Sequence, residues 1–275
     1  MTEALTVTTA YSGAQGSARW RGATVTDGAA FRRYMRSRVS ARVHDTAHRA
    51  GVEDALRGLA STSMETAFVE SFLKAAPPIN SWEIGEALAE CVLADDATVK
   101  ACWPWNSARD RRTPRASLPG ADLVGFCRVG DEVLLLFGEV KTSSDPATPP
   151  GVMTGRTGMT TQLERLATDG GLQFALVNWL FARCQDPVHE DLFRLASERF
   201  IASSGRALVV AGVLVRDTQP NALDLQSRAA SLAATINAGG GGAGTVDANT
   251  RVELIALYAP IPINDWPELV SPVLP

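Results

Sequence analysis

The chain is poor in cysteine, histidine and lysine, and it has no long apolar run. Its 275 residues include 4 cysteines, which are too widely spaced to indicate a zinc site or a disulfide framework. No apolar segment approaches the roughly 18 residues of a membrane span, and the acidic start Met1-Thr2-Glu3 is unlike a signal peptide. The sequence therefore predicts a cytoplasmic protein that does not enter a membrane.

Two common catalytic motifs are also missing. The glycine-rich stretch at 239–244 is not followed by Gly-Lys-Ser/Thr, which a phosphate-binding loop requires, and no Gly-x-Ser-x-Gly elbow is present. These absences argue against a P-loop nucleotidase and an α/β-hydrolase.

The overall composition is that of a folded domain. Hydrophobic residues make up 45% of the chain, and the net charge is only −4, which excludes a disordered chain. The net negative charge argues against nonspecific binding of nucleic acid over the whole surface, but it allows a local basic groove. Only 3 of the 26 basic residues are lysines, so a lysine within a motif stands out.

Hydrophobic periodicity and turn signals predict alternating helices and strands. Short pieces precede the main pattern: an edge strand at 4–8, an arginine-rich amphipathic segment at 31–49, and weak helices at 52–59 and 65–73. Helices are then expected at 80–93, 160–168, 172–184, 190–201 and 222–238. Strands are expected at 99–105, 121–128, 133–141, 206–215 and 251–258.

This order predicts an α/β fold with a mixed central sheet between helices. The pattern divides the chain into a partly helical N-terminal elaboration (1–60) and an α/β domain (61–275) whose core covers about 80–215.

The strongest candidate site lies on the two strands expected at 121–128 and 133–141. Glu139 and Lys141 are two residues apart, so their side chains share one face of the second strand. A hairpin through Gly130-Asp131 would bring Asp122 alongside them. Two close carboxylates repel each other unless a cation lies between them, so this grouping indicates a functional site.

These residue types suit metal-assisted hydrolysis. Carboxylate oxygens are the ligands that Mg²⁺ and Mn²⁺ prefer, and such a metal activates water and polarises a phosphodiester. A lysine adds a point charge that can orient the water and stabilise developing charge. About 0.15 Glu-x-Lys matches are expected by chance in this composition. The alternative is an ordinary surface ion pair at a strand end.

Asp122 with Glu139-Val140-Lys141 resembles the signature of the PD-(D/E)xK nuclease superfamily. The resemblance implies a restriction-endonuclease-like core of helix, three strands, helix and strand, which matches the order expected from 80 to 215. It further implies that Asp122, Glu139 and the Val140 carbonyl bind Mg²⁺ or Mn²⁺, and that Lys141 orients the attacking water. The departure from the pattern is that Pro119 does not directly precede the aspartate.

Two further residues resemble supporting positions of that superfamily. Glu86 lies on the first core helix, where some members carry a glutamate, and Glu83 and Glu90 share its face. Gln162 lies on the helix after the Glu-x-Lys strand, where some members carry a glutamine.

The function implied by the resemblance is a Mg²⁺-dependent endodeoxyribonuclease with DNA as its partner. Bacterial members commonly act in restriction, repair or anti-phage defence. The same residues would also serve an RNA nuclease. Cutting both strands of a duplex with one site per chain would call for a homodimer. The main alternative is a non-cutting nucleic-acid-binding or scaffold subunit that works with a helicase-type partner.

Arginines just before the first site strand offer a second, weaker signal. Arg109, Arg111, Arg112 and Arg115 follow two tryptophans, and basic groups near aromatic rings can hold a phosphate backbone and stack on bases. The equally supported alternative is a solvated loop beside tryptophans of the core.

Overall fold

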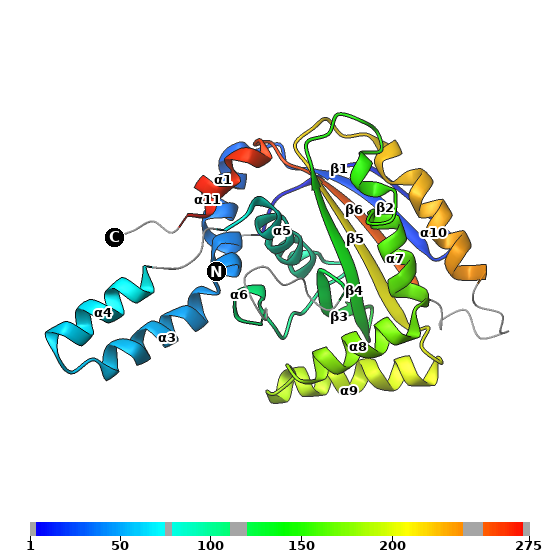
Figure 1. Cartoon of the computed structure of the whole chain (residues 1–275). Helices are drawn as coiled ribbons and strands as arrows, with labels where there is room; N and C mark the ends of the chain where they lie inside the picture. Colours follow the sequence, from blue (N-terminus) through cyan, green and yellow to red (C-terminus); the bar gives the residue numbers. More distant parts are fainter. Residues whose placement is uncertain (1–3, 75–78, 111–119, 239–249, 272–275) are drawn as a thin grey trace.

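The computed structural model describes residues 4–74, 79–110, 120–238 and 250–271. A six-stranded mixed sheet forms the centre, with the strand order β1-β2-β6-β5-β4-β3 (Figure 1). Its strands are β1 (Thr8–Gln15), β2 (Ala18–Thr24), β3 (Leu123–Val129), β4 (Glu132–Ser143), β5 (Leu208–Arg216) and β6 (Arg251–Tyr258). The four inner strands β2, β6, β5 and β4 are parallel, whereas β1 and β3 are antiparallel edge strands. The expected α/β class is confirmed.

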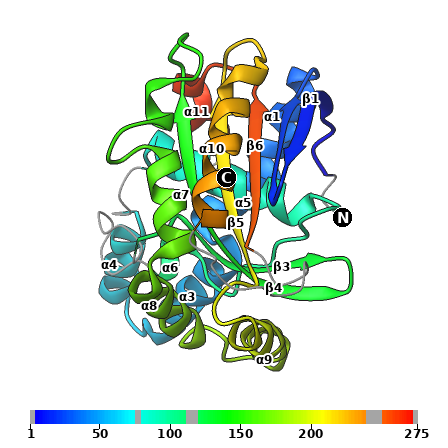
Figure 2. The same cartoon turned by 90° about the vertical axis from the view of Figure 1, so that its right-hand side faces the viewer.

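Helices cover both faces of the sheet. The first face is covered by α1 (Gly28–Tyr34), a π-helical turn η1 (Met35–Val39), α2 (Ser40–His44), α5 (Ser81–Asp95) and α11 (Trp266–Val270). The second face is covered by α7 (Met159–Thr168), α8 (Gly170–Phe181), α9 (Pro187–Ala202) and α10 (Gln226–Ala238) (Figure 2). We call these the α5 face and the α7 face. Short elements complete the chain: α6 (Ser107–Asp110), η2 (Gly151–Met153), η3 (Ala222–Asp224) and η5 (Ile263–Asp265).

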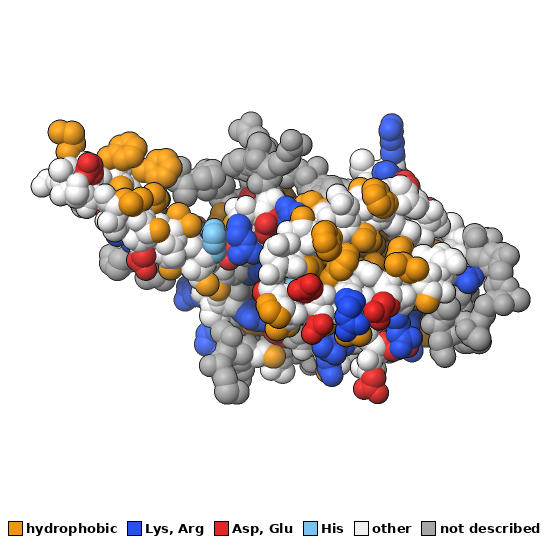
Figure 3. Space-filling model, turned by 90° about the horizontal axis from the view of Figure 1, so that it is seen from below, with side chains coloured by type: hydrophobic (Ala, Val, Ile, Leu, Met, Phe, Trp, Pro, Cys, Tyr) orange, Lys and Arg blue, Asp and Glu red, His pale blue; other side chains and the backbone are white. Residues whose placement is uncertain are grey.

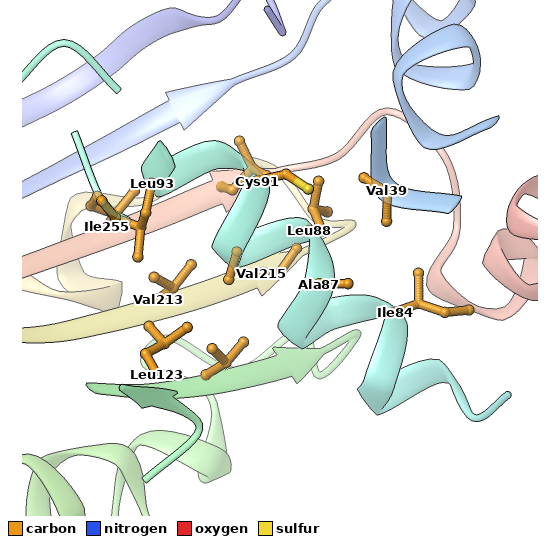
Figure 4. Packing of buried hydrophobic residues seen from close by; sticks show 14 of the residues in the cluster. Val39, Ile84, Ala87, Leu88, Cys91, Leu93, Leu123, Val213, Val215 and Ile255 are labelled. Atoms are coloured by element: carbon orange, nitrogen blue, oxygen red, sulfur yellow. The ribbon is translucent and has the colours of Figure 1, made fainter. Parts of the chain in front are cut away.

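The inner strands form because their side chains are buried on both faces. Every residue of β5 is buried, as expected for a central parallel strand with helices above and below. On the α5 face, Ile84, Leu88 and Cys91 recur at helical spacing and belong to one buried cluster with Val39 of η1 and with Val213 and Val215 of β5 (Figure 4). The Asn80 N–H donates to the Glu83 carboxylate at 2.8 Å, and the helix begins at Ser81 as the sequence predicts.

The N-terminal segment contributes to the central sheet. The expected strand at 4–8 lies further along, at Thr8–Gln15, and its hairpin partner Ala18–Thr24 was not expected. This partner pairs in parallel with β6, so residues 8–24 extend the sheet. Small and polar residues hide the strand pattern of this segment, since β1 has no buried residue and β2 buries only Ala18, Gly22 and Ala23.

The strand expected at 99–105 does not form. Only an isolated bridge joins Cys102 to Phe126, and Lys100 has a positive φ of 46°. Pro104 cannot donate to a sheet ladder, and the left-handed backbone at Lys100 bends the chain. Of the three strands expected before the helix, the structure therefore has two.

Two helices project from the body as an arm. The arm consists of α3 (Thr46–Leu59) and α4 (Ser63–Leu73), and neither helix has a buried residue. Apolar side chains are exposed along it, among them Met64, Phe68 and Phe72 (Figure 3). A second group of exposed apolar side chains lies on α8 and α9, with Phe174 74% and Ile201 75% exposed. No helix in the described ranges is both long and apolar enough to cross a membrane.

Candidate active site at the end of strand β4

The hairpin of β3 and β4 brings the predicted acidic residues together. Val129 pairs with Glu132, so Gly130 and Asp131 form the predicted two-residue turn, with Gly130 at a φ of +62°. Leu123 pairs with Gly138, and continuing this register by one residue places Asp122 opposite Glu139. The Asp122 N–H donates to the Gly138 carbonyl at 3.0 Å, which attaches the beginning of β3 to β4.

The side chains of these residues converge. Asp122 Oδ2 accepts a hydrogen bond from the Val140 N–H at 2.9 Å. Lys141 Nζ donates to Glu139 Oε1 at 2.7 Å. Glu139 is only 7% exposed, so its carboxyl group is largely removed from water, whereas the Lys141 side chain is partly exposed. The structure thus assembles two acids and one ammonium at one end of the sheet.

The two carboxyl groups of this cluster repel each other. Burial, followed by repulsion from the Asp122 carboxylate, raises the pKa of Glu139 to about 7, and the hydrogen bond from Lys141 lowers it only in part. A cation between the two carboxyl groups would relieve this repulsion.

The donor atoms fit a hard divalent cation. In an extended strand the N–H and C=O of one residue point to the same side. Because the Val140 N–H points at Asp122, the Val140 carbonyl lies on the Asp122 side as well. The described residues hold no group of three or more His, Cys, Asp or Glu side chains suited to a metal. The candidate donors are therefore two carboxylates and one carbonyl, all oxygen atoms of the kind that Mg²⁺ and Mn²⁺ take.

Gln162 lies on the same side of the sheet as Glu139. Met159 and Leu163 of α7 pack onto Gly212, which pairs with Glu139 across β4 and β5. A Cβ at Gly212 would lie 2.8 Å from Leu163 and 2.9 Å from Met159, so the glycine allows α7 to approach the strand. The half-buried Gln162 side chain makes no hydrogen bond to another described residue, which leaves its amide available to a ligand.

Glu86 reaches the same end of the sheet from the opposite face. Gly85 contacts the Thr142 side chain so closely that any Cβ there would collide with its hydroxyl. The first turn of α5 therefore lies beside the end of β4, with Glu86 half-buried next to this contact. On the same helix, Glu83 accepts from Asn80, and Glu90 pairs with Arg42 at 2.5 Å.

The predicted arginine-rich loop is only partly described. Arg111, Arg112 and Arg115 lie outside the described residues. The guanidinium of Arg109 is 3.4 Å from Asp45 and 3.3 Å from Asp110, so carboxylates balance its charge. Trp105 is 1% exposed and packs edge-on against Trp179 at 5.1 Å, so it belongs to the core and cannot stack on a base.

A buried polar network next to the site was not predicted. Arg216 is the last residue of β5 and pairs with Ser143 of β4. Its Nη1 donates to both Asp224 carboxylate oxygens at 2.6 Å. Tyr258 donates its hydroxyl proton to Asp224 at 2.7 Å. Arg216 also donates to the Asp145 carbonyl, which holds the loop that follows the site strand. The one sequence signal was an arginine at the carboxyl end of an apolar strand, a position where parallel sheets place functional groups.

Comparison with known proteins adds no relative: no family model, curated protein or solved structure matches this chain. The geometry of Asp122, Glu139, Val140 and Lys141 is therefore what a functional assignment must rest on.

Proposed function

We propose that the chain is a metal-dependent nuclease that hydrolyses phosphodiester bonds of DNA at the Asp122–Glu139–Lys141 cluster. The observation that carries the proposal is the convergence of two carboxylates and a carbonyl beside one lysine, with Glu139 buried. A bound Mg²⁺ or Mn²⁺ would polarise the phosphodiester and activate a water. The PD-(D/E)xK pattern of these residues supports the same chemistry.

Each residue has a distinct part in this proposal. Asp122 and Glu139 would hold the cation, and the Val140 N–H orients the Asp122 carboxylate. Lys141 gives up part of its bond to Glu139 and holds the attacking water while charge develops on the phosphate. Gln162 and Glu86 would support the site from the two flanking helices.

Cleavage assays test this proposal. The wild-type protein and the variants Glu139→Gln and Lys141→Met are incubated with supercoiled plasmid and linear DNA in Mg²⁺, in Mn²⁺ and in EDTA. We expect metal-dependent cleavage by the wild type and a loss of at least about 100-fold in each variant. Arg194→Ala, which removes an exposed ion pair with Glu198 on α9, is the matched control. Cleavage that survives both site substitutions would refute the assignment.

A second candidate function is a non-cutting subunit that binds a protein partner. The exposed apolar side chains of the α3–α4 arm favour this reading, because a helical hairpin without buried residues gains stability from being covered. The double variant Phe68→Ser/Phe72→Ser separates the two functions. The nuclease proposal predicts that this variant cleaves DNA like the wild type, whereas a scaffold would lose its function in cells.

A further inference from the structure

The first helical segment of the chain is strongly basic. Residues 28–44 form α1, η1 and α2, and they include five arginines and no acidic residue, in a chain whose net charge is −4. The side chains of Phe31, Tyr34 and Met35 are buried in the cluster of the α5 face. The amphipathic segment expected at 31–49 therefore begins as a helix with an apolar inner side and a basic outer side.

Three of these arginines have no carboxylate beside them. Arg32, Arg33 and Arg36 are exposed, and their guanidinium groups make no hydrogen bond or ion pair with another described residue. Asp27 acts on Arg33 only at longer range, and its carboxylate accepts the first N–H groups of α1. We call Arg32, Arg33 and Arg36 the arginine patch. Its charges are free to bind an anion.

The other two arginines of the segment have a structural role. Arg38 lies 3.0 Å from Asp95, and Arg42 lies 2.5 Å from Glu90. Both acids belong to α5, so these two pairs attach the segment to the helix beneath it. The arginine patch makes no such contact, and the packing of the fold does not account for its three charges.

The arrangement of the patch suits a phosphate backbone. Arg32 and Arg36 are about one helical turn apart, or about 5–6 Å, and one strand of duplex DNA carries a phosphate about every 3.4 Å. The planar fork of a guanidinium group can donate two hydrogen bonds to one phosphate. A membrane is a poorer partner, because the large apolar side chains of α1 are buried and cannot insert among lipids.

We propose that the arginine patch binds the phosphate backbone of duplex DNA and holds the duplex against the proposed nuclease site. The proposal rests on the proposed nuclease function, which makes DNA the polyanion. The patch does not touch the reacting atoms. Its part is to supply affinity that does not depend on sequence, through charge and hydrogen bonds to phosphates.

The patch and the nuclease site lie at the same edge of the sheet. Three residues connect β2 to α1, and Glu139 lies near the carboxyl end of β4. β2 and β4 run parallel with β6 and β5 between them, so their carboxyl ends are about 14 Å apart (Figure 1). About four phosphates of one DNA strand cover that distance. Because α1 lies on the α5 face and Glu139 on the side of α7, the bound strand would cross this edge of the sheet.

DNA binding in the absence of metal tests the patch. The wild type and the triple variant Arg32→Gln/Arg33→Gln/Arg36→Gln are titrated in EDTA onto a fluorescently labelled DNA duplex at several salt concentrations. Glutamine has nearly the helix propensity of arginine, so the variant should fold, and circular dichroism checks this. We expect it to bind at least about tenfold more weakly, with a slope of log K against log salt that is shallower by about 2–3.

A second triple variant controls for the net charge. Arg57→Gln/Arg194→Gln/Arg199→Gln changes the net charge by the same amount, but it removes arginines that lie beside carboxylates. It should bind DNA like the wild type. Three results would overturn the patch proposal: equal binding by the wild type and the patch variant, an equal loss in both triple variants, or no DNA binding by the folded wild type. Patch-dependent binding to vesicles of anionic phospholipid, but not to DNA, would overturn it as well.

Cleavage assays separate this proposal from the nuclease proposal. With Mg²⁺ the patch variant should cleave plasmid with a raised KM and an unchanged kcat, because it loses only binding that is equal in the ground state and the transition state. Cleavage by the wild type with no change of KM in the patch variant would overturn only the patch proposal. Patch-dependent DNA binding without cleavage in any metal would overturn only the nuclease proposal.

Discussion

Two clusters of charged side chains lie at the carboxyl ends of the neighbouring strands β4 and β5, and they differ in charge balance. On β5, Arg216 and Asp224 form a pair of opposite charges that is almost completely buried, at 1% and 0% exposure. On β4, Asp122 and Glu139 are two acids that repel each other, and Lys141 bonds to Glu139. The first cluster therefore pairs opposite charges, whereas the second brings like charges together and raises the pKa of Glu139.

The pair on β5 belongs to a structural network. Arg216 and Tyr258 satisfy Asp224, and Arg216 also donates to two carbonyls of the following loop. Its buried Nε has no hydrogen-bond partner among the described residues. The Glu139 carboxyl group is instead held in a position that raises its pKa and costs folding stability. Such a cost is typical of functional sites, where groups are arranged for a ligand.

The largest effect is expected from breaking the balanced pair. Arg216→Met leaves the Asp224 carboxylate buried without its cation and should lower the free energy of unfolding by about 3–5 kcal/mol. Urea denaturation at pH 7 measures the change. The double variant Arg216→Met/Asp224→Leu should recover most of the loss, because no charge is then left buried. If Arg216→Met lowers the free energy of unfolding by less than about 1 kcal/mol, the pair contributes little to stability.

The cluster of Asp122 and Glu139 should lower the stability of the protein when its buried acid is charged. The pKa of Glu139 is raised from 4.5 to about 7, so between these pH values the folded protein keeps a proton that the unfolded chain has lost. Stability should therefore fall as pH rises from 4.5 to 7, by about 1–3 kcal/mol, and stay low above pH 7 in EDTA.

Glu139→Gln removes this titration, because glutamine does not ionise. Unlike Arg216→Met, it should not destabilise the protein. At pH 8 in EDTA the variant should be more stable than the wild type by a similar amount, and at pH 4.5 the two should be nearly equal. Denaturation curves at the two pH values give the comparison. A variant that is less stable than the wild type at pH 8 would mean that the ion pair with Lys141 outweighs the burial of the carboxylate.

The site could be predicted from sequence because its determinants are local. Glu139 and Lys141 share a face through simple strand alternation, and Gly130-Asp131 encodes the turn that brings Asp122 opposite. The helices with strong apolar periodicity were predicted for the same reason, and the strand expected at 251–258 has those bounds in the structure.

Features that depend on tertiary contacts could not be predicted. The hairpin of β1 and β2 has little apolar alternation and is held in place by pairing with β6, more than 200 residues further along the chain. The expected strand at 99–105 does not form, because the backbone bends at Lys100. The Arg216–Asp224–Tyr258 network joins residues that only the fold brings together, and the place of Arg216 at the end of an apolar strand does not identify its partners.

The measurement that tests the central claim most directly is the stability of the wild type and of Glu139→Gln at pH 8 as Mg²⁺ is added. It needs neither a substrate nor a partner protein. If the cluster on β4 is a site for a divalent cation, Mg²⁺ at ten times its dissociation constant should stabilise the wild type by about 1.4 kcal/mol and leave the variant unchanged. Equal stabilisation of both proteins, or of neither, would contradict the metal site and with it the proposed chemistry.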